Sequence, residues 1–222
     1  MITISIDQQL KETAPNLVLG VVSAPVEVTK NSPPLWVEIN KRIKEIESEI
    51  TMASLYNVPQ IKALRDAYKA LGKDPGRYRG SQEALVRRIL QGKGLYKINT
   101  IVDINNLVSL ETLHSVGAYN VDNIKSPMIF RVGKPGESYK GIGKEVINIA
   151  ELPLFADDAG PFGSPTSDSE RAMITMDAKN IMIVIISFTG QDHLRGQLQR
   201  TANLLCDYAG APRDKIETAI VE

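Results

Sequence analysis

The segment Ile181–Phe188 is the most apolar run in the sequence, and it constrains the fold more than any other feature. It holds eight consecutive uncharged residues, most of them β-branched or aromatic. A short run of this kind, without alternation of polar and apolar residues, is typical of a strand that is covered on both faces. The segment therefore predicts a buried central strand, around which the remaining elements have to be arranged.

Other short segments also have the pattern of strands. Ile2–Ile6 alternates apolar and hydroxyl-bearing residues, and Leu17–Val22 is apolar enough to fill a central strand. The remaining strand predictions are Ile98–Val102, Met128–Val132, Val146–Ile149, Leu152–Phe155, Ala172–Met176 and Lys215–Val221. Asp157–Pro165 is rich in glycine and proline and is predicted to be a long loop, which in a compact domain is usually functional or mobile.

Helices are predicted mainly in the first half of the chain and near its end. After Ser32-Pro33, a hydroxyl cap followed by proline, apolar residues recur every three or four positions from Trp36 to Ile50. The other predicted helices are Asn57–Leu71, Gln82–Leu90 with Ser81 as its cap, a short helix with Asp103 as its N-cap, and Gln191–Tyr208. This order predicts an α+β fold. We expect one domain over residues 1–222, with N-terminal strands and a helix in 1–59 and the core in 60–222.

The composition excludes several classes of site. A single cysteine, Cys206, rules out an internal disulfide framework, and two histidines make a histidine-rich metal centre a poor interpretation. The longest uncharged run, Thr13 to Val26, has fourteen residues, and the run from Asn180 to Gln191 has twelve; both are too short to cross a bilayer. The first twelve residues have no secretory pattern. We therefore expect a soluble cytoplasmic protein with no bound metal and no membrane contact.

The charge is balanced over the whole chain but not along it. The formal net charge is zero, with 26 Lys and Arg against 26 Asp and Glu. From Gln60 to Lys97, however, ten basic residues face three acidic ones, a net charge of +7 that the remainder has to offset. Basic clusters are the usual footprint of nucleic-acid binding. The candidate RNA-binding residues are Arg77, Arg79, Arg87, Arg88 and Lys93.

Common catalytic motifs are missing from the sequence. Gly143-Lys144 does not complete a phosphate-binding loop, because Ser138 stands at the first glycine position and Glu145 at the hydroxyl position. We expect no cofactor. Asp157, Asp158, Asp168 and Glu170 flank the Gly/Pro segment and can serve either acid–base chemistry or turns and caps. His114 has two open interpretations, a functional group and an ordinary surface histidine.

From Arg65 onward the sequence resembles the stand-alone relatives of the B3/B4 domain, the editing domain of the bacterial phenylalanyl-tRNA synthetase beta subunit. The segments that carry the resemblance are Val102–Leu110, Gly117–Ile124, Phe130-Arg131, Gly136-Glu137, Gly143, Ala156–Gly160 and Ser169-Glu170-Arg171 ahead of Thr175. Upstream, Asp74–Arg79 and Glu83–Arg88 also resemble the stand-alone members. The resemblance covers about two thirds of the chain and implies a three-layer α+β fold with a β-sandwich-like core and flanking helices.

The resemblance also implies an activity and a pocket. In the synthetase, this domain hydrolyses tyrosine that is wrongly attached to the phenylalanine tRNA. Asn106 and Glu170 match two polar positions of the pocket, so the resemblance assigns them catalytic roles. The asparagine would orient a water molecule or donate to the ester carbonyl, and the glutamate would accept a hydrogen bond from the bound amino acid. The expected substrate-binding positions are Gly117, Gly143, His114, Arg131 and Ala211, although Arg131 can instead form a structural ion pair. No ATP-site motif is present, and we do not expect aminoacylation of tRNA.

Two departures from the family pattern keep the function open. The family histidine is Gly117 here, and the threonine of a Thr-x-Ala pair is Ala209. One hypothesis is a tRNA-binding protein that hydrolyses mischarged aminoacyl-tRNA in trans. The alternatives are a non-catalytic module that binds RNA or an amino acid, and a protein-interaction or metabolic role on a reused fold.

Overall fold

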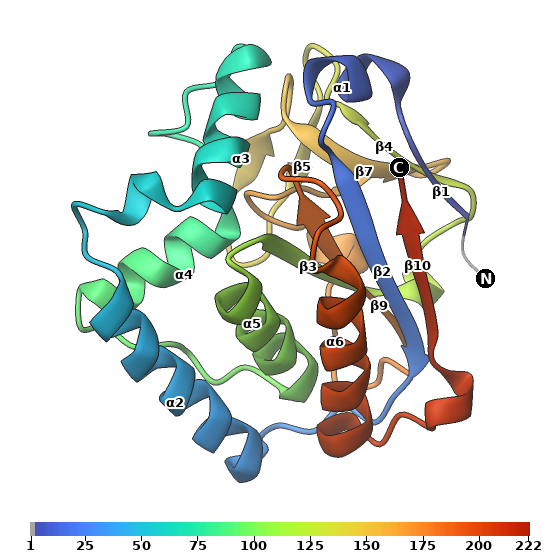
Figure 1. The fold of residues 1–222 in the computed structure, drawn as a ribbon. Helices are drawn as coiled ribbons and strands as arrows, with labels where there is room; N and C mark the ends of the chain where they lie inside the picture. The colour runs from blue at the N-terminus through green and yellow to red at the C-terminus, as the bar shows by residue number, and fades with distance from the viewer. Residues whose placement is uncertain (1–2) are drawn as a thin grey trace.

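The computed structural model describes residues 3–222, which form six helices, ten strands and short 3-10 turns (Figure 1). The helices are α1 Gln8–Thr13, α2 Pro33–Glu49, α3 Pro59–Ala70, α4 Ser81–Leu90, α5 Thr100–Thr112 and α6 Leu194–Ala209. The strands are β1 Ile4–Ile6, β2 Val18–Pro25, β3 Ser115–Asn120, β4 Met128–Val132, β5 Ser138–Lys140, β6 Val146–Asn148, β7 Pro153–Asp157, β8 Gly160–Gly163, β9 Asn180–Ser187 and β10 Glu217–Val221.

The strands are arranged in two four-stranded sheets and one hairpin. The inner sheet has the order β10-β2-β9-β3 and is antiparallel throughout, so the apolar run in β9 is an interior strand, as predicted. The outer sheet has the order β1-β4-β7-β8, in which β1 and β4 are parallel and the other pairs are antiparallel. Strands β5 and β6 form the hairpin. Because β2 also lies inside the inner sheet, the N-terminal part of the chain is built into the main core.

The two faces of the inner sheet are buried against different layers. Met182, Val184 and Ile186 of β9 pack with Phe130 and Phe155 of the outer sheet. The alternate residues of β9, at positions 181, 183 and 185, share a core with residues of α2, α5 and α6. Helix α6 lies in front of this sheet in Figure 1, and α2 lies at the lower left. This alternation around one strand produces outer sheet, inner sheet and helices as three layers. The predicted α+β fold with a sandwich-like core is confirmed.

Helices α3 and α4 stand to one side of the three layers (left in Figure 1) and have a small core of their own. Ile61 of α3 and Val86 and Ile89 of α4 are buried with Ile46 of α2 and Leu110 of α5. Leu64, Ala67 and Tyr68 of α3 pack instead into the core between the two sheets. Apart from the buried Glu83, the charged side chains of the two helices are at least partly exposed.

Some predicted elements were wrong. Ile98–Val102 is not a strand, because α5 begins at Thr100 and the side chain of Asn99, not Asp103, caps it by accepting from the Val102 amide at 2.9 Å. Ala172–Met176 follows a 3-10 helix, η3 Glu170–Ala172, and forms no strand. The loop predicted over Asp157–Pro165 contains β8, which pairs with β7 after a tight turn. The prediction over Ile2–Ile6 was confirmed from Ile4 onward, and Ile2 lies outside the described residues.

Candidate functional site

The two residues expected to be catalytic lie on opposite sides of the inner sheet. Asn106 is on α5, whose apolar residues pack against the helical face of that sheet. Glu170 is in η3 beside β8, on the side of the outer sheet, where its carboxylate lies 3.0 Å from the Lys140 ammonium. The two side chains are therefore supplied by different elements of the fold, and a common pocket for them stays a prediction.

The space beside Gly117 is filled by a tyrosine. A Cβ atom added to Gly117 would lie 2.2 Å from the Tyr119 hydroxyl, and one added to Gly163 would lie 2.4 Å from it. The Tyr119 ring is fully buried and makes edge contacts with Phe155 and Phe162, with ring centres 5.7 and 5.2 Å away. Both glycines are thus required by the close approach of this ring, and nothing in the sequence pattern had singled out Tyr119.

The Tyr119 hydroxyl donates to Asp168 Oδ1 at 2.9 Å. Burial raises the pKa of Asp168 to about 7, even though the hydrogen bonds from Tyr119 and the Ser164 amide and the charge of Lys144 lower it. A carboxyl group that titrates near neutral pH can exchange a proton with a substrate. Asp168 was one of the acids flanking the Gly/Pro segment in the sequence, but only the packing distinguishes it from the others.

The β5–β6 hairpin brings Gly143 to the same segment. Gly141 forms a β-bridge with Ser169, and the Ile142 amide donates to the Asp168 carbonyl at 3.1 Å. Gly143 is exposed in the hairpin turn with φ +62°, a conformation that favours glycine. Of the predicted site residues, Glu170 ends the segment 163–170, and Gly117 and the hairpin that carries Gly143 lie next to this segment.

The other predicted substrate-binding residues have structural partners elsewhere. Arg131 makes two hydrogen bonds to the Glu137 carboxylate, at 2.7 and 2.8 Å, which matches the ion-pair alternative. Ala211 is buried in the helical core after α6. His114 is 4% exposed at the start of β3, and burial lowers its pKa to about 4, so its ring is neutral at neutral pH.

Helices α3 and α4 hold the segment that carries Asp168. The Tyr68 hydroxyl of α3 lies 2.8 Å from the Thr166 hydroxyl. The Ser81 amide, at the start of α4, donates to the Pro165 carbonyl at 2.7 Å, and the Ser115 hydroxyl donates to the same carbonyl at 3.1 Å. The positions of the two helices and of this segment are therefore linked.

The same two helices carry the basic cluster, and its acidic residues are all engaged. Asp66 faces Lys62 and Lys69, and Glu83 lies 3.0 Å from Arg65 and 3.8 Å from Arg79. The Asp74 side chain accepts from the Gly76 amide at 2.8 Å. Within residues 3–222, this leaves no carboxylate paired with the remaining predicted RNA-binding residues, which are Arg77, Arg87, Arg88 and Lys93. We call these four residues and Arg79 the α3–α4 basic surface.

Tyrosines are interleaved with these cations. The Arg88 guanidinium lies 3.9 Å from the centre of the Tyr96 ring, and Arg65 lies 4.5 Å from that of Tyr56. Arg87 donates to the Tyr56 hydroxyl at 2.7 Å. Tyr56 and Tyr96 were not predicted as site residues, although Tyr56 lies just before the basic segment in the sequence and Tyr96 lies near its end.

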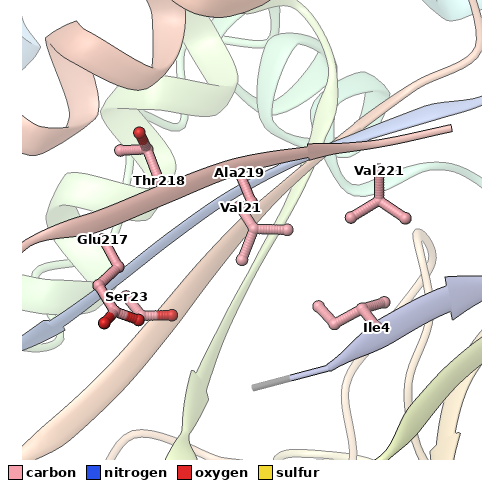
Figure 2. A pocket seen from close by; sticks show the side chains of 7 residues that line it. All are labelled: Ile4, Val21, Ser23, Glu217, Thr218, Ala219 and Val221. Carbon is pink, nitrogen blue, oxygen red and sulfur yellow. The ribbon is translucent and has the colours of Figure 1, made fainter. Parts of the chain in front are cut away.

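Figure 2 shows an apolar cavity at the edge of the sandwich, away from both regions. Ile4 of β1 faces Val21 of β2 and Ala219 and Val221 of β10 across it. It offers about 30 Å³ to the centres of water-sized spheres, which is room for about two water molecules. It is too small for an amino acid or a nucleotide.

Metal and membrane interpretations receive no support from the described residues. No group of three or more His, Cys, Asp or Glu side chains in residues 3–222 is arranged to hold a metal ion. In the same residues, no helix is long and apolar enough to cross a membrane.

Comparisons with known proteins agree with the resemblance found in the sequence. A family model described as the B3/4 domain matches residues 63–204. The phenylalanine–tRNA ligase beta subunit of Idiomarina loihiensis is 26% identical over 118 residues, which are 50% of this chain and only 14% of that protein. An N-terminal fragment of the phenylalanyl-tRNA synthetase beta subunit from Pyrococcus horikoshii aligns with 99% of this chain and 50% of its own, with 13% identity and a TM-score of 0.47.

Proposed function

The chain belongs to the B3/4 domain family, and from this premise we propose that it is a tRNA-binding protein that uses the α3–α4 basic surface. The observation that carries the proposal is the set of arginines and lysines on this surface that have no acidic partner in the part of the chain that the structure describes. Such cations gain most from phosphate, since no carboxylate has to be displaced. The expected setting is the cytoplasm, with tRNA and not DNA as the partner.

A second candidate activity is hydrolysis of the aminoacyl ester of a mischarged tRNA, and Asp168 favours it. With a pKa of about 7, the Asp168 carboxylate can take a proton from water as the water attacks the ester carbonyl. The bond from the carbonyl carbon to the ribose oxygen then breaks, and the proton passes to that oxygen. The Tyr119 ring has to move first, because it fills the space beside Gly117 and Gly163.

The alternative of a non-catalytic RNA- or amino acid-binding module is favoured by the Tyr119 ring, which fills the space beside Gly117 and Gly163. In either case the basic surface and the Asp168 segment are coupled, because Tyr68 and Ser81 of α3 and α4 hold Thr166 and Pro165. RNA binding is thus the property that the two candidates share.

Binding of fluorescently labelled tRNA, followed by anisotropy, tests the proposal. We expect Arg87→Glu plus Arg88→Glu to weaken binding at least about tenfold, since both cations become anions on the surface. The matched control is Arg213→Glu plus Lys215→Glu, the same charge change at two exposed residues after α6, which is expected to weaken binding less than about twofold. Equal weakening by the two pairs would contradict the assignment of this surface.

Release of amino acid from a panel of mischarged tRNAs tests the second candidate. Asp168→Asn should abolish turnover while tRNA binding persists, and Glu170→Ala and Asn106→Ala report on the residues that the resemblance assigns. If the folded wild-type protein turns over none of the substrates but still binds tRNA, the non-catalytic candidate is correct.

A further inference from the structure

Tyr96 is the most exposed aromatic residue of the described chain and is held in place by an arginine. It lies between α4 and α5 and is 65% exposed, whereas most tyrosines of the protein are half or fully buried. The Arg88 guanidinium covers one face of its ring at 3.9 Å and also donates to the Lys93 carbonyl at 3.3 Å. A ring supported on one face and open to solvent is pre-ordered for a second planar partner.

Tyr56 repeats this arrangement beside the other arginine of α4. It is 40% exposed, the Arg65 guanidinium lies 4.5 Å from its ring centre, and Arg87 donates to its hydroxyl at 2.7 Å. Neither ring belongs to a hydrophobic core. Both are therefore aromatic surfaces that consecutive arginines of one helix hold in position.

We propose that Tyr56 and Tyr96 are stacking positions for unpaired nucleobases, so that this surface takes a single-stranded segment of RNA. The inference rests on the proposed RNA binding and specifies which form of RNA is bound. Bases in a duplex are stacked on each other and offer no free face, whereas unpaired bases stack on aromatic side chains while arginines contact the adjacent phosphates. The two arginines of α4 supply both functions, because each positions a ring and carries a charge without an acidic partner.

The test compares a labelled single-stranded RNA of about 12 nucleotides with a hairpin that buries the same sequence in a duplex. We expect Tyr96→Ala to weaken binding of the single strand at least about fivefold, the lower range for one stacked base, and to leave the hairpin unchanged. Tyr96→Phe keeps the ring and should bind the single strand as the wild type does. Because Tyr96 is exposed, neither change is expected to affect folding, which circular dichroism checks.

The outcomes separate this inference from the proposed function. If Tyr96→Ala weakens both RNAs equally, or neither, stacking is overturned while RNA binding stands. If neither RNA nor tRNA binds to the folded wild-type protein, the proposed function fails as well. If an equal concentration of polyglutamate displaces the single strand as well as unlabelled RNA does, the surface attracts any polyanion and the stacking inference is wrong.

Discussion

Two arginines at the outer sheet, Arg131 in β4 and Arg171 in η3 beside β8, differ in their partners from the two arginines of α4. Arg171 makes two hydrogen bonds of 2.9 Å to the Asp157 carboxylate, and Arg131 is bound in the same way by Glu137. Arg87 and Arg88 contact tyrosines instead and have no acidic partner in residues 3–222. The first pair holds loops onto the sheet, whereas the second pair remains available for a ligand.

The presence or absence of an acidic partner thus separates the charged side chains that stabilise the fold from those available for a ligand. A formal net charge of zero does not argue against RNA binding when the acidic residues are already engaged near the basic segment or lie elsewhere in the fold. Substitutions in the two sets of arginines should therefore have different effects, on stability for the first set and on RNA affinity for the second.

The largest expected effect is on the stability of the outer sheet. Arg171→Ala leaves the Asp157 side chain without its cation but with two backbone amide donors, which we expect to cost about 1.5–3 kcal/mol of unfolding free energy. Urea unfolding at pH 7 measures this loss, and tRNA affinity should not change under native conditions. A loss below about 1 kcal/mol would show that this ion pair contributes no more to the unfolding free energy than the arginines of α4 do.

The stability difference also has a predicted pH dependence. Burial acts to raise the pKa of Asp157, but Arg171 and two backbone amides outweigh it and hold the pKa below its ordinary value. A lowered acid pKa contributes stability above the ordinary pKa of about 4, and this contribution is lost as the pH falls through the folded value. The effect of Arg171→Ala should therefore shrink in acid.

A smaller effect of opposite sign is expected at Asp168. Its pKa is raised to about 7 in the folded protein. The contribution of this group to the free energy of unfolding is therefore fully present below about pH 4 and is lost as the pH rises through about 7. Asp168→Asn removes the charge but can still accept from Tyr119. We expect it to raise the thermal midpoint at pH 8 by at least about 2 °C and to leave it nearly unchanged at pH 4.

Asp158→Asn is the matched control, because this acid is exposed at the turn between β7 and β8. It should show no such difference between pH 4 and pH 8. A midpoint of Asp168→Asn that does not differ from the wild type at pH 8 would mean that the Asp168 carboxylate carries no cost when it is charged.

The sequence predicted those parts of the fold that depend on local pattern. The β-branched run of β9 and the apolar spacing of α2 each match one element closely, because burial and periodicity decide both. The prediction failed at Ile98–Val102, where an apolar run resembles a strand but the Asn99 side chain starts a helix. It also missed β8, since Gly160-Pro161-Phe162-Gly163 has little strand propensity and its pairing is imposed by β7.

The candidate site was predictable only where it depends on composition. The basic segment was visible as a count of charges. Tyr56 just before it and Tyr96 within it could have been included, because aromatic and basic residues together are a signal of nucleic-acid binding. The properties of Asp168 and Tyr119 could not be predicted. Their burial arises from packing of β3 against β8 and the segment 163–170, which lie far apart in the sequence.

The salt dependence of tRNA binding tests the central claim most directly, because it counts the cations that contact phosphate. The charge-neutralising pair Arg87→Gln plus Arg88→Gln should make the plot of log affinity against log salt concentration less steep by about 2, roughly one for each cation removed. Arg213→Gln plus Lys215→Gln should leave the slope unchanged. An unchanged slope for the α4 pair, in protein that binds tRNA, would contradict the assignment of these unpaired arginines to RNA.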